Sequence, residues 1–210
     1  MSNLAEQADP GHIGLFIGQL DDLAARTVEK RRRLGNEVSA LLFGRGVGET
    51  ARRMAAAGAR VVVAETPSGT LASGLRAQPF TLATLPDPGE LPEAPFDVVV
   101  GQLALHALPY EQARRAVRRL LMLLKIGGKL YLSAYGLHST LGDHYPDSGK
   151  LIEHRFAELP PPLAESYDLH GPVCLYSERN LITLLFEVGA SVLQSATGPL
   201  GNVRAVAVRV

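Results

Sequence analysis

The amino-acid sequence predicts an α/β fold of the doubly wound type, with a mostly parallel sheet covered by helices on both faces. Strand-like and helix-like segments alternate along the chain, an order typical of parallel sheets. A glycine turn containing Gly44, Gly46 and Gly48 joins a buried apolar run to a helical stretch. Ligands of such folds bind at the carboxyl ends of strands, where a glycine turn exposes backbone N–H groups. We therefore expect a site for a nucleotide-like ligand at this turn.

Composition limits the classes of protein to consider. With 210 residues and 46% hydrophobic content, the chain can bury one core, so we expect a single domain over residues 1–210. Lys and Arg balance Asp and Glu at 21 each, which gives no net attraction to nucleic acid or an anionic membrane. The apolar runs are far shorter than the roughly 20 residues of a membrane span, and the amino terminus lacks an export signal. A single cysteine, Cys174, fits a reducing cytoplasm.

The first half of the chain supplies the leading helix and the first strands. Residues 13–34 carry a loose apolar stripe that ends before Gly35, which predicts a helix within an N-terminal helical extension, residues 1–37. The basic run 30–33 falls in its last turn, where cations suit the helix dipole. The following elements are a strand at 38–43, a helix at 49–57, strands at 60–64 and 79–84, a proline-rich turn at 86–95, and a strand at 96–101.

The second half contains the clearest helix and a long irregular segment. Residues 111–125 place apolar side chains on one face and arginines on the other, which predicts an amphipathic helix before a strand at 129–134. Residues 135–176 are polar and interrupted by three prolines, and an insertion of that length is usually functional or disordered. Ser177 caps a helix at 178–188, and strands at 191–196 and 203–210 form an antiparallel pair.

Two cofactor classes bind at a glycine turn of this kind. Glu65 follows the turn by about 20 residues, at the tip of the neighbouring strand, where a carboxylate can hold both ribose hydroxyls. Dinucleotide enzymes favour G-x-G-x-x-G, but Glu49 stands at the third glycine position, and its charge would repel a pyrophosphate. A nicotinamide oxidoreductase is therefore the weaker interpretation.

Several motifs in order extend the comparison beyond the turn. The G-x-G-x-G spacing and Glu65 are followed by FDVVVGQLALHALP at 96–109, LLKIGG at 123–128 and KLYLSA at 129–134. Together these resemble the class I S-adenosylmethionine-dependent methyltransferases over residues 38–134 and, more weakly, over the final helix and hairpin. The resemblance implies a Rossmann-like, seven-stranded sheet with an antiparallel last strand, a transferase activity, and S-adenosylmethionine as the cofactor.

The resemblance also implies which residues contact the cofactor. The glycine turn would lie near the methionine part, Glu65 at the ribose, Thr84 and Leu85 near the adenine, and Gly101 and Gln102 beside the sulfonium. The implied cofactor-binding residues are Gly44, Arg45, Gly46, Gly48, Glu65, Thr66, Thr84, Leu85, Gly101 and Gln102. The acceptor would be a small or medium-sized molecule.

Three positions depart from the family pattern. Leu42 stands where an acidic residue often helps to hold the methionine ammonium, Arg45 replaces a small residue in the turn, and Thr84 stands where an acidic residue often contacts the cofactor. Lost hydrogen bonds to a charged group each cost on the order of 1.5–3 kcal/mol. A degenerate relative that binds the cofactor or a protein partner without catalysis is therefore the alternative function.

Catalytic residues are not identified by the sequence, because a sulfonium methyl group chiefly requires alignment with its acceptor. We expect the insertion 135–176 to form the acceptor pocket or a lid, with a floppy insertion as the alternative. The candidate acceptor contacts are His106, Tyr135, His138, His144 and Tyr145. The histidines and aspartates of this segment match no metal-ligand spacing, so no metal is expected.

Overall fold

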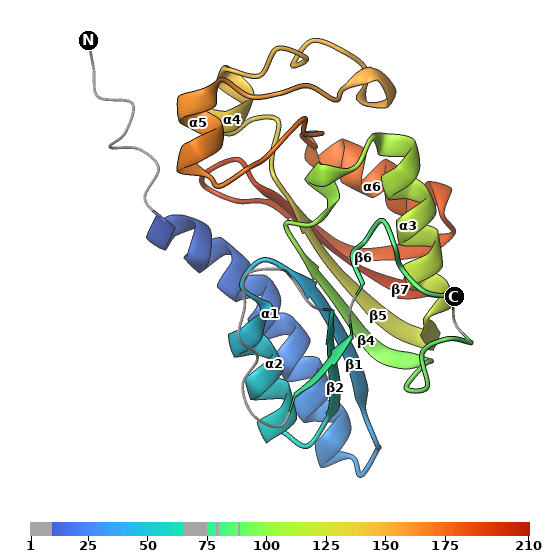
Figure 1. Ribbon diagram of the computed structural model, residues 1–210. Helices are drawn as coiled ribbons and strands as arrows, with labels where there is room; N and C mark the ends of the chain where they lie inside the picture. Colours follow the sequence, from blue (N-terminus) through green and yellow to red (C-terminus); the bar gives the residue numbers. More distant parts are fainter. Residues whose placement is uncertain (1–9, 65–74, 79, 88) are drawn as a thin grey trace.

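The computed structural model describes residues 10–64, 75–78, 80–87 and 89–210, for 10–18 and 76 as backbone only. It contains a seven-stranded sheet flanked by helices (Figure 1). The strands are β1 (Ser39–Gly44), β2 (Arg60–Ala64), β3 (Arg76–Gln78), β4 (Phe96–Gln102), β5 (Leu124–Ala134), β6 (Ala190–Thr197) and β7 (Val203–Arg209). The helices are α1 (Pro10–Arg33), α2 (Val47–Ala56), α3 (Tyr110–Met122), α4 (Thr140–Asp143), α5 (Pro161–Ser166) and α6 (Glu178–Glu187), with 3₁₀ turns η2 (Leu105–Ala107) and η3 (Ile152–His154).

The strand order β3-β2-β1-β4-β5-β7-β6 confirms the predicted fold class. Strands β1 to β5 pair in parallel, whereas β7 is antiparallel to both β5 and β6. Chain order reverses on the two sides of β1, where β2 and β4 are both its neighbours. The carboxyl ends of strands at such a reversal leave a crevice for ligands.

Side chains alternate between two apolar layers, one on each face of the sheet. In β1, Leu42 packs with residues of α1 and α2, whereas Leu41 and Phe43 pack with residues of α3 and α6. Figure 1 shows the same division, with α1 and α2 on one face and α3 and α6 on the other. Both faces are therefore covered, as parallel strands with continuous apolar sequences require.

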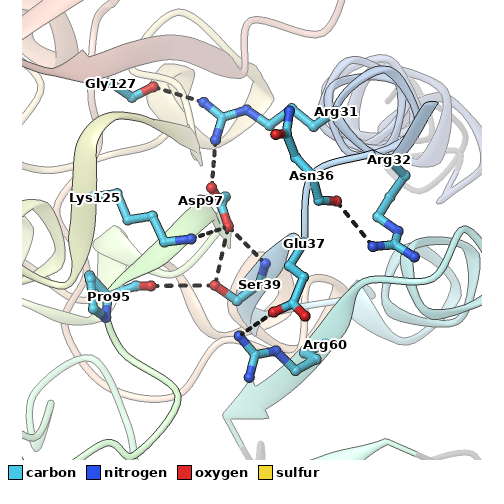
Figure 2. A network of polar contacts seen from close by, with 10 residues as sticks. All are labelled: Arg31, Arg32, Asn36, Glu37, Ser39, Arg60, Pro95, Asp97, Lys125 and Gly127. Carbon is cyan, nitrogen blue, oxygen red and sulfur yellow. Dashed lines mark hydrogen bonds and ion pairs between the residues drawn. The ribbon is translucent and has the colours of Figure 1, made fainter. Parts of the chain in front are cut away.

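A polar network anchors the end of α1 at the amino ends of the strands (Figure 2). Asp97 of β4 accepts hydrogen bonds from Arg31 at 2.6 Å, from Lys125 at 2.8 Å and from the Ser39 N–H at 2.9 Å. Arg31 also donates to the Gly127 carbonyl oxygen at 3.0 Å. The basic run at the end of α1 thus includes a specific tertiary contact, in addition to its favourable place on the helix dipole.

Two predicted elements are corrected by the structure. The strand expected at 79–84 is wrong: β3 ends at Gln78, and Thr81 and Thr84 instead close a turn, each N–H donating to the other hydroxyl at 2.9 and 3.2 Å. The helix expected at 111–125 ends at Met122, because Leu123 and Leu124 meet the start of β4, where the Phe96 N–H donates to the Leu123 carbonyl oxygen at 2.7 Å.

The segment 135–176 has its own apolar core and is not a structureless loop. It contains α4, η3 and α5, and its buried residues Tyr135, Leu141, Tyr145 and Leu159 form a separate cluster. Figure 1 shows α4 and α5 side by side, beyond one end of the sheet. In the described part of the chain, no helix combines the length and apolar character needed to cross a membrane.

Candidate functional site

The glycine turn lies directly against the carboxyl end of β4. Gly44 and Gly46 have φ angles of 96° and 72°, a region that residues with a Cβ rarely adopt. A Cβ on Gly44 would lie 1.9 Å from the carbonyl oxygen of Gln102, and the N–H of Arg45 donates to that same oxygen at 3.0 Å. Gly44 is therefore required for the contact between the turn and β4.

The other two glycines leave the backbone open to a ligand. Among the described atoms, a Cβ on Gly46 would approach only the Gln102 Oε1, at 3.7 Å, and a Cβ on Gly48 would approach nothing within 4 Å. No side chain in this part of the structure caps the amino end of α2. The first N–H groups of α2 can therefore donate to a ligand, and the helix dipole favours negative charge there.

A cavity of about 380 Å³ adjoins the turn at the carboxyl ends of β1, β2 and β4. Its volume falls in the range of small-molecule sites. Its walls are mostly apolar and come from four parts of the chain. The lining residues are Phe43, Gly44, Arg45, Ala64, Phe80, Thr81, Leu82, Ala83, Leu103, Ala104, His106, Ala107 and Leu108.

His106 is the titratable imidazole on the cavity wall. Burial, together with the positive charge of Arg45, lowers its pKa to about 4, so the ring is neutral near pH 7. Its Nδ1 atom is buried and has no hydrogen-bond partner among the described residues. The ring packs edge-on against Tyr135, with the centroids 4.9 Å apart. The site thus contains an uncharged imidazole of fixed orientation.

A carboxylate from α1 lies beside the turn. Asp21 accepts hydrogen bonds from the Gln102 Nε2 and the Thr50 hydroxyl. Burial raises the pKa of Asp21, and these hydrogen bonds with the nearby charge of Arg53 offset the increase only in part. Gln102 is fully buried, and its Oε1 has no partner among the described residues. No sequence pattern distinguishes Asp21, because Asp22 beside it has the same side chain.

Arg45 connects the turn to the segment 135–176. Its guanidinium donates to the Tyr167 carbonyl oxygen at 2.8 Å, to the Asp168 carbonyl oxygen, and to the Asp168 Oδ2 at 3.0 Å. Asp168 has a φ of 49°, which is uncommon for a residue other than glycine. The arginine that departs from the family pattern therefore ties the segment to the edge of the cavity.

The predicted cofactor residues fall into three groups. Glu65 and Thr66 lie outside the described residues. Thr84 and Leu85 do not line the cavity, where Thr81, Leu82 and Ala83 stand instead. Gly101 faces the apolar layer that contains Phe43 and Leu132, since a Cβ there would lie 2.4 Å from the Phe43 ring. The structure thus places Gln102 next to the glycine turn. In the cavity lining, Thr81 and Leu82 take the places predicted for Thr84 and Leu85, three residues later in the sequence.

The predicted acceptor residues do not form one cluster. His106 lines the cavity with Tyr135 behind it, whereas His138 and His144 are exposed. Tyr145 is buried, and its hydroxyl donates to the Val173 carbonyl oxygen at 2.5 Å and accepts from the Ala157 N–H at 3.2 Å. The hydroxyl of Tyr145 therefore has structural partners in the core of segment 135–176.

Comparison with known proteins agrees with this geometry. Residues 41–132 match the family described as Methyltransferase domain, and this range covers most of β1, the glycine turn and β4. No curated protein matches the chain's sequence.

Solved methyltransferase structures share the fold. A SAM-dependent methyltransferase from Methanosarcina mazei is 18% identical, with 83% of this chain and 93% of that chain covered and a TM-score of 0.59. The magnesium protoporphyrin IX methyltransferase from Synechocystis PCC 6803 with bound SAH is 19% identical, with coverages of 90% and 83% and a TM-score of 0.56. The N-methyltransferase NodS from Bradyrhizobium japonicum WM9 is 14% identical, with coverages of 91% and 97% and a TM-score of 0.56.

Identity at this level shows the fold alone, and the family model covers residues 41–132 of the 210-residue chain. The comparisons therefore show that the chain has the fold of solved methyltransferases and that residues 41–132 are similar to the Methyltransferase domain family.

Proposed function

We propose that this protein transfers the methyl group of S-adenosylmethionine to a small or medium-sized acceptor bound beside the cavity at the glycine turn. One observation carries the proposal: the family's glycine turn opens onto a largely apolar cavity of about 380 Å³ at the switch point of the sheet. A cavity of this size holds a nucleoside or a comparable small molecule. The acceptor is proposed as a small molecule, because the net charge is zero and no basic field attracts nucleic acid.

The residues present fit the cofactor. Gly46 and Gly48 leave backbone exposed for its amino-acid part, and the apolar side chains of Phe80 and Leu82 offer a wall for an adenine ring. Glu65, proposed to hold the ribose, follows directly on Ala64, which lines the cavity. The resemblance adds Gly44, Arg45, Thr66, Thr84, Leu85 and Gly101 to the proposed cofactor-binding residues, and of these Gly44 and Arg45 line the cavity.

The work of the protein in such a site is alignment and exclusion of water. When bound, S-adenosylmethionine supplies an electrophilic methyl group. The chain positions the acceptor against it, and positioning can supply roughly 7–11 kcal/mol of the barrier. The neutral His106 offers its Nδ1, which has no hydrogen-bond partner among the described residues, to a hydroxyl or amino proton of the acceptor, and Tyr135 fixes the ring plane.

The segment 135–176 is proposed as the lid and part of the acceptor pocket. Its contacts through Arg45 place Tyr167 and Asp168 at the rim of the turn, and its own core keeps that rim ordered. We further propose one domain over residues 1–210 and a cytoplasmic location, the latter because the single cysteine, Cys174, is buried as a free thiol.

The deciding experiment is calorimetric titration with S-adenosylmethionine, S-adenosylhomocysteine and NAD in parallel. We expect the first two to bind, and the Glu65→Ala variant to bind S-adenosylhomocysteine about tenfold more weakly, as the loss of a charged hydrogen bond predicts. Binding of NAD alone would identify an oxidoreductase. Binding of none of the three would favour a relative that serves a protein partner, and binding without methyl transfer to any of a panel of small hydroxyl, amino and carboxyl acceptors would favour a non-catalytic one.

A further inference from the structure

The residue type that usually holds the cofactor ammonium is absent from its usual place. Leu42 stands there, and it packs in the same apolar cluster as Leu20 of α1. Leu20 directly precedes Asp21. The helix that covers Leu42 therefore also brings a carboxylate to the glycine turn.

Asp21 and Gln102 together place several hydrogen-bond acceptors at the glycine turn. Gln102 donates through Nε2 to Asp21, and this leaves its Oε1 directed at Gly46, where a Cβ would lie 3.7 Å away. Gln102 is fully buried, and its Oε1 has no partner in the described part of the chain. A buried acceptor without a donor costs about 1–3 kcal/mol, so a donor from a bound ligand would relieve this cost among the described residues.

The charge at this position indicates that the donor is cationic. Arg53, the nearby cation, donates to Asp22 at 2.7 Å and to Glu29 at 3.1 Å, whereas Asp21 accepts hydrogen bonds from the neutral groups of Thr50 and Gln102. A partly buried carboxylate gains most from a positive partner. An ammonium group carries three donors, which suits a carboxylate and an amide oxygen together.

Resting on the proposed function, we propose that Asp21 and Gln102 bind the α-ammonium group of the cofactor's methionine part. The Asp21 carboxylate provides the charge, and the Gln102 Oε1 provides the second acceptor next to Gly46. The N-terminal helix is thereby a component of the cofactor site.

The test compares two ligands on matched variants by calorimetry. The ligands are S-adenosylhomocysteine and its analogue in which hydrogen replaces the α-amino group. The variants are Asp21→Asn and, as a control for loss of one charge on the same helix, Asp22→Asn. Asp21→Asn should bind S-adenosylhomocysteine at least tenfold more weakly and the desamino analogue as the parent does. Asp22→Asn should bind both ligands as the parent does.

Other outcomes are equally informative. Unchanged affinity of Asp21→Asn for S-adenosylhomocysteine would overturn the proposal, as would an equal loss for both ligands, because Asp21 would then act on the pocket as a whole. If Asp21→Asn does not fold, the parent still decides: equal affinity for the two ligands would overturn ammonium recognition. A parent that binds neither ligand would overturn the proposed function itself.

Discussion

The two ends of strand β4 bury polar side chains in opposite ways. At the amino end, Asp97 is buried and takes hydrogen bonds from Arg31, Lys125 and Ser39 (Figure 2). Burial alone would raise its pKa, but these hydrogen bonds and the positive charges of Lys125 and Arg31 lower it below the usual range. At the carboxyl end, the Gln102 Oε1 is buried without a partner among the described residues, and the pKa of the adjacent Asp21 is raised.

This difference assigns the amino end of β4 to stability and its carboxyl end to ligand binding. The Asp97 network satisfies its charges inside the fold, as buried ion pairs must to be tolerated. At the carboxyl end, the Gln102 Oε1 and the His106 Nδ1 have no hydrogen-bond partner among the described residues, at a cost that a ligand can remove. Substitutions at the amino end of β4 should therefore change stability. At its carboxyl end, some substitutions should change backbone packing and others should change ligand affinity.

The largest effect is expected from Gly44→Ala. The new Cβ would press on the Gln102 carbonyl oxygen from a left-handed backbone position. Strain and overpacking together should lower the free energy of unfolding by about 4 kcal/mol. Urea unfolding measures the change, with Gly48→Ala as the control, because a Cβ on Gly48 meets nothing described within 4 Å and its φ is not positive. Equal stability of the two variants would show that the backbone at Gly44 shifts to accommodate the new Cβ without loss of stability.

Asp97→Ala should follow, with a loss of about 3 kcal/mol in the free energy of unfolding. It leaves the Ser39 N–H buried without its acceptor and removes the partner of two cations that are only partly exposed. The matched control is Asp87→Ala, whose pair with Arg119 is exposed and should contribute less than about 1 kcal/mol. Changed affinity of folded Asp97→Ala for S-adenosylhomocysteine would contradict the separation of the two ends.

His106 predicts a pH dependence of stability at the carboxyl end. Its pKa is lowered to about 4 in the folded protein, against about 6.5 when unfolded, so between these values the unfolded state binds the additional proton. The parent should therefore lose stability as pH falls from 6.5 to 4, by about 2.5 kcal/mol at pH 4.5. Urea unfolding of parent and His106→Gln at pH 7.5 and 4.5 isolates this contribution. An equal loss in both proteins would assign the acid sensitivity to other groups.

The sequence predicted the parts of the molecule that local patterns determine. Alternating apolar runs gave the strands of the central sheet, and the glycine spacing gave the turn. The predicted strand at 79–84 failed because the hydroxyls of Thr81 and Thr84 satisfy backbone groups in a turn, which an apolar pattern does not reveal. Asp21 and Asp97 were not identified, because their importance comes from partners 81 and 66 residues away.

The smallest effect on global stability, and the most local one, is expected from Arg45→Ala. The lost contacts are hydrogen bonds and an ion pair at a half-exposed guanidinium, worth about 1 kcal/mol together. These contacts join segment 135–176 to the turn, so their loss should favour local opening of that segment and leave the sheet closed. Hydrogen exchange of backbone amides in residues 163–170 should accelerate about fivefold, with no change in β1 and β4.

Two comparisons decide whether this contact closes a lid. Asp168→Asn removes the exposed half of the ion pair but keeps the carbonyl oxygens that Arg45 binds, and should accelerate exchange less than Arg45→Ala does. In the parent, S-adenosylhomocysteine should slow exchange in the same residues, because a bound ligand stabilises a closed lid. Absence of added protection anywhere in 135–176, with the ligand bound and a candidate acceptor present, would mean that the segment only caps the end of the sheet and that the rim of the cavity is rigid from the start.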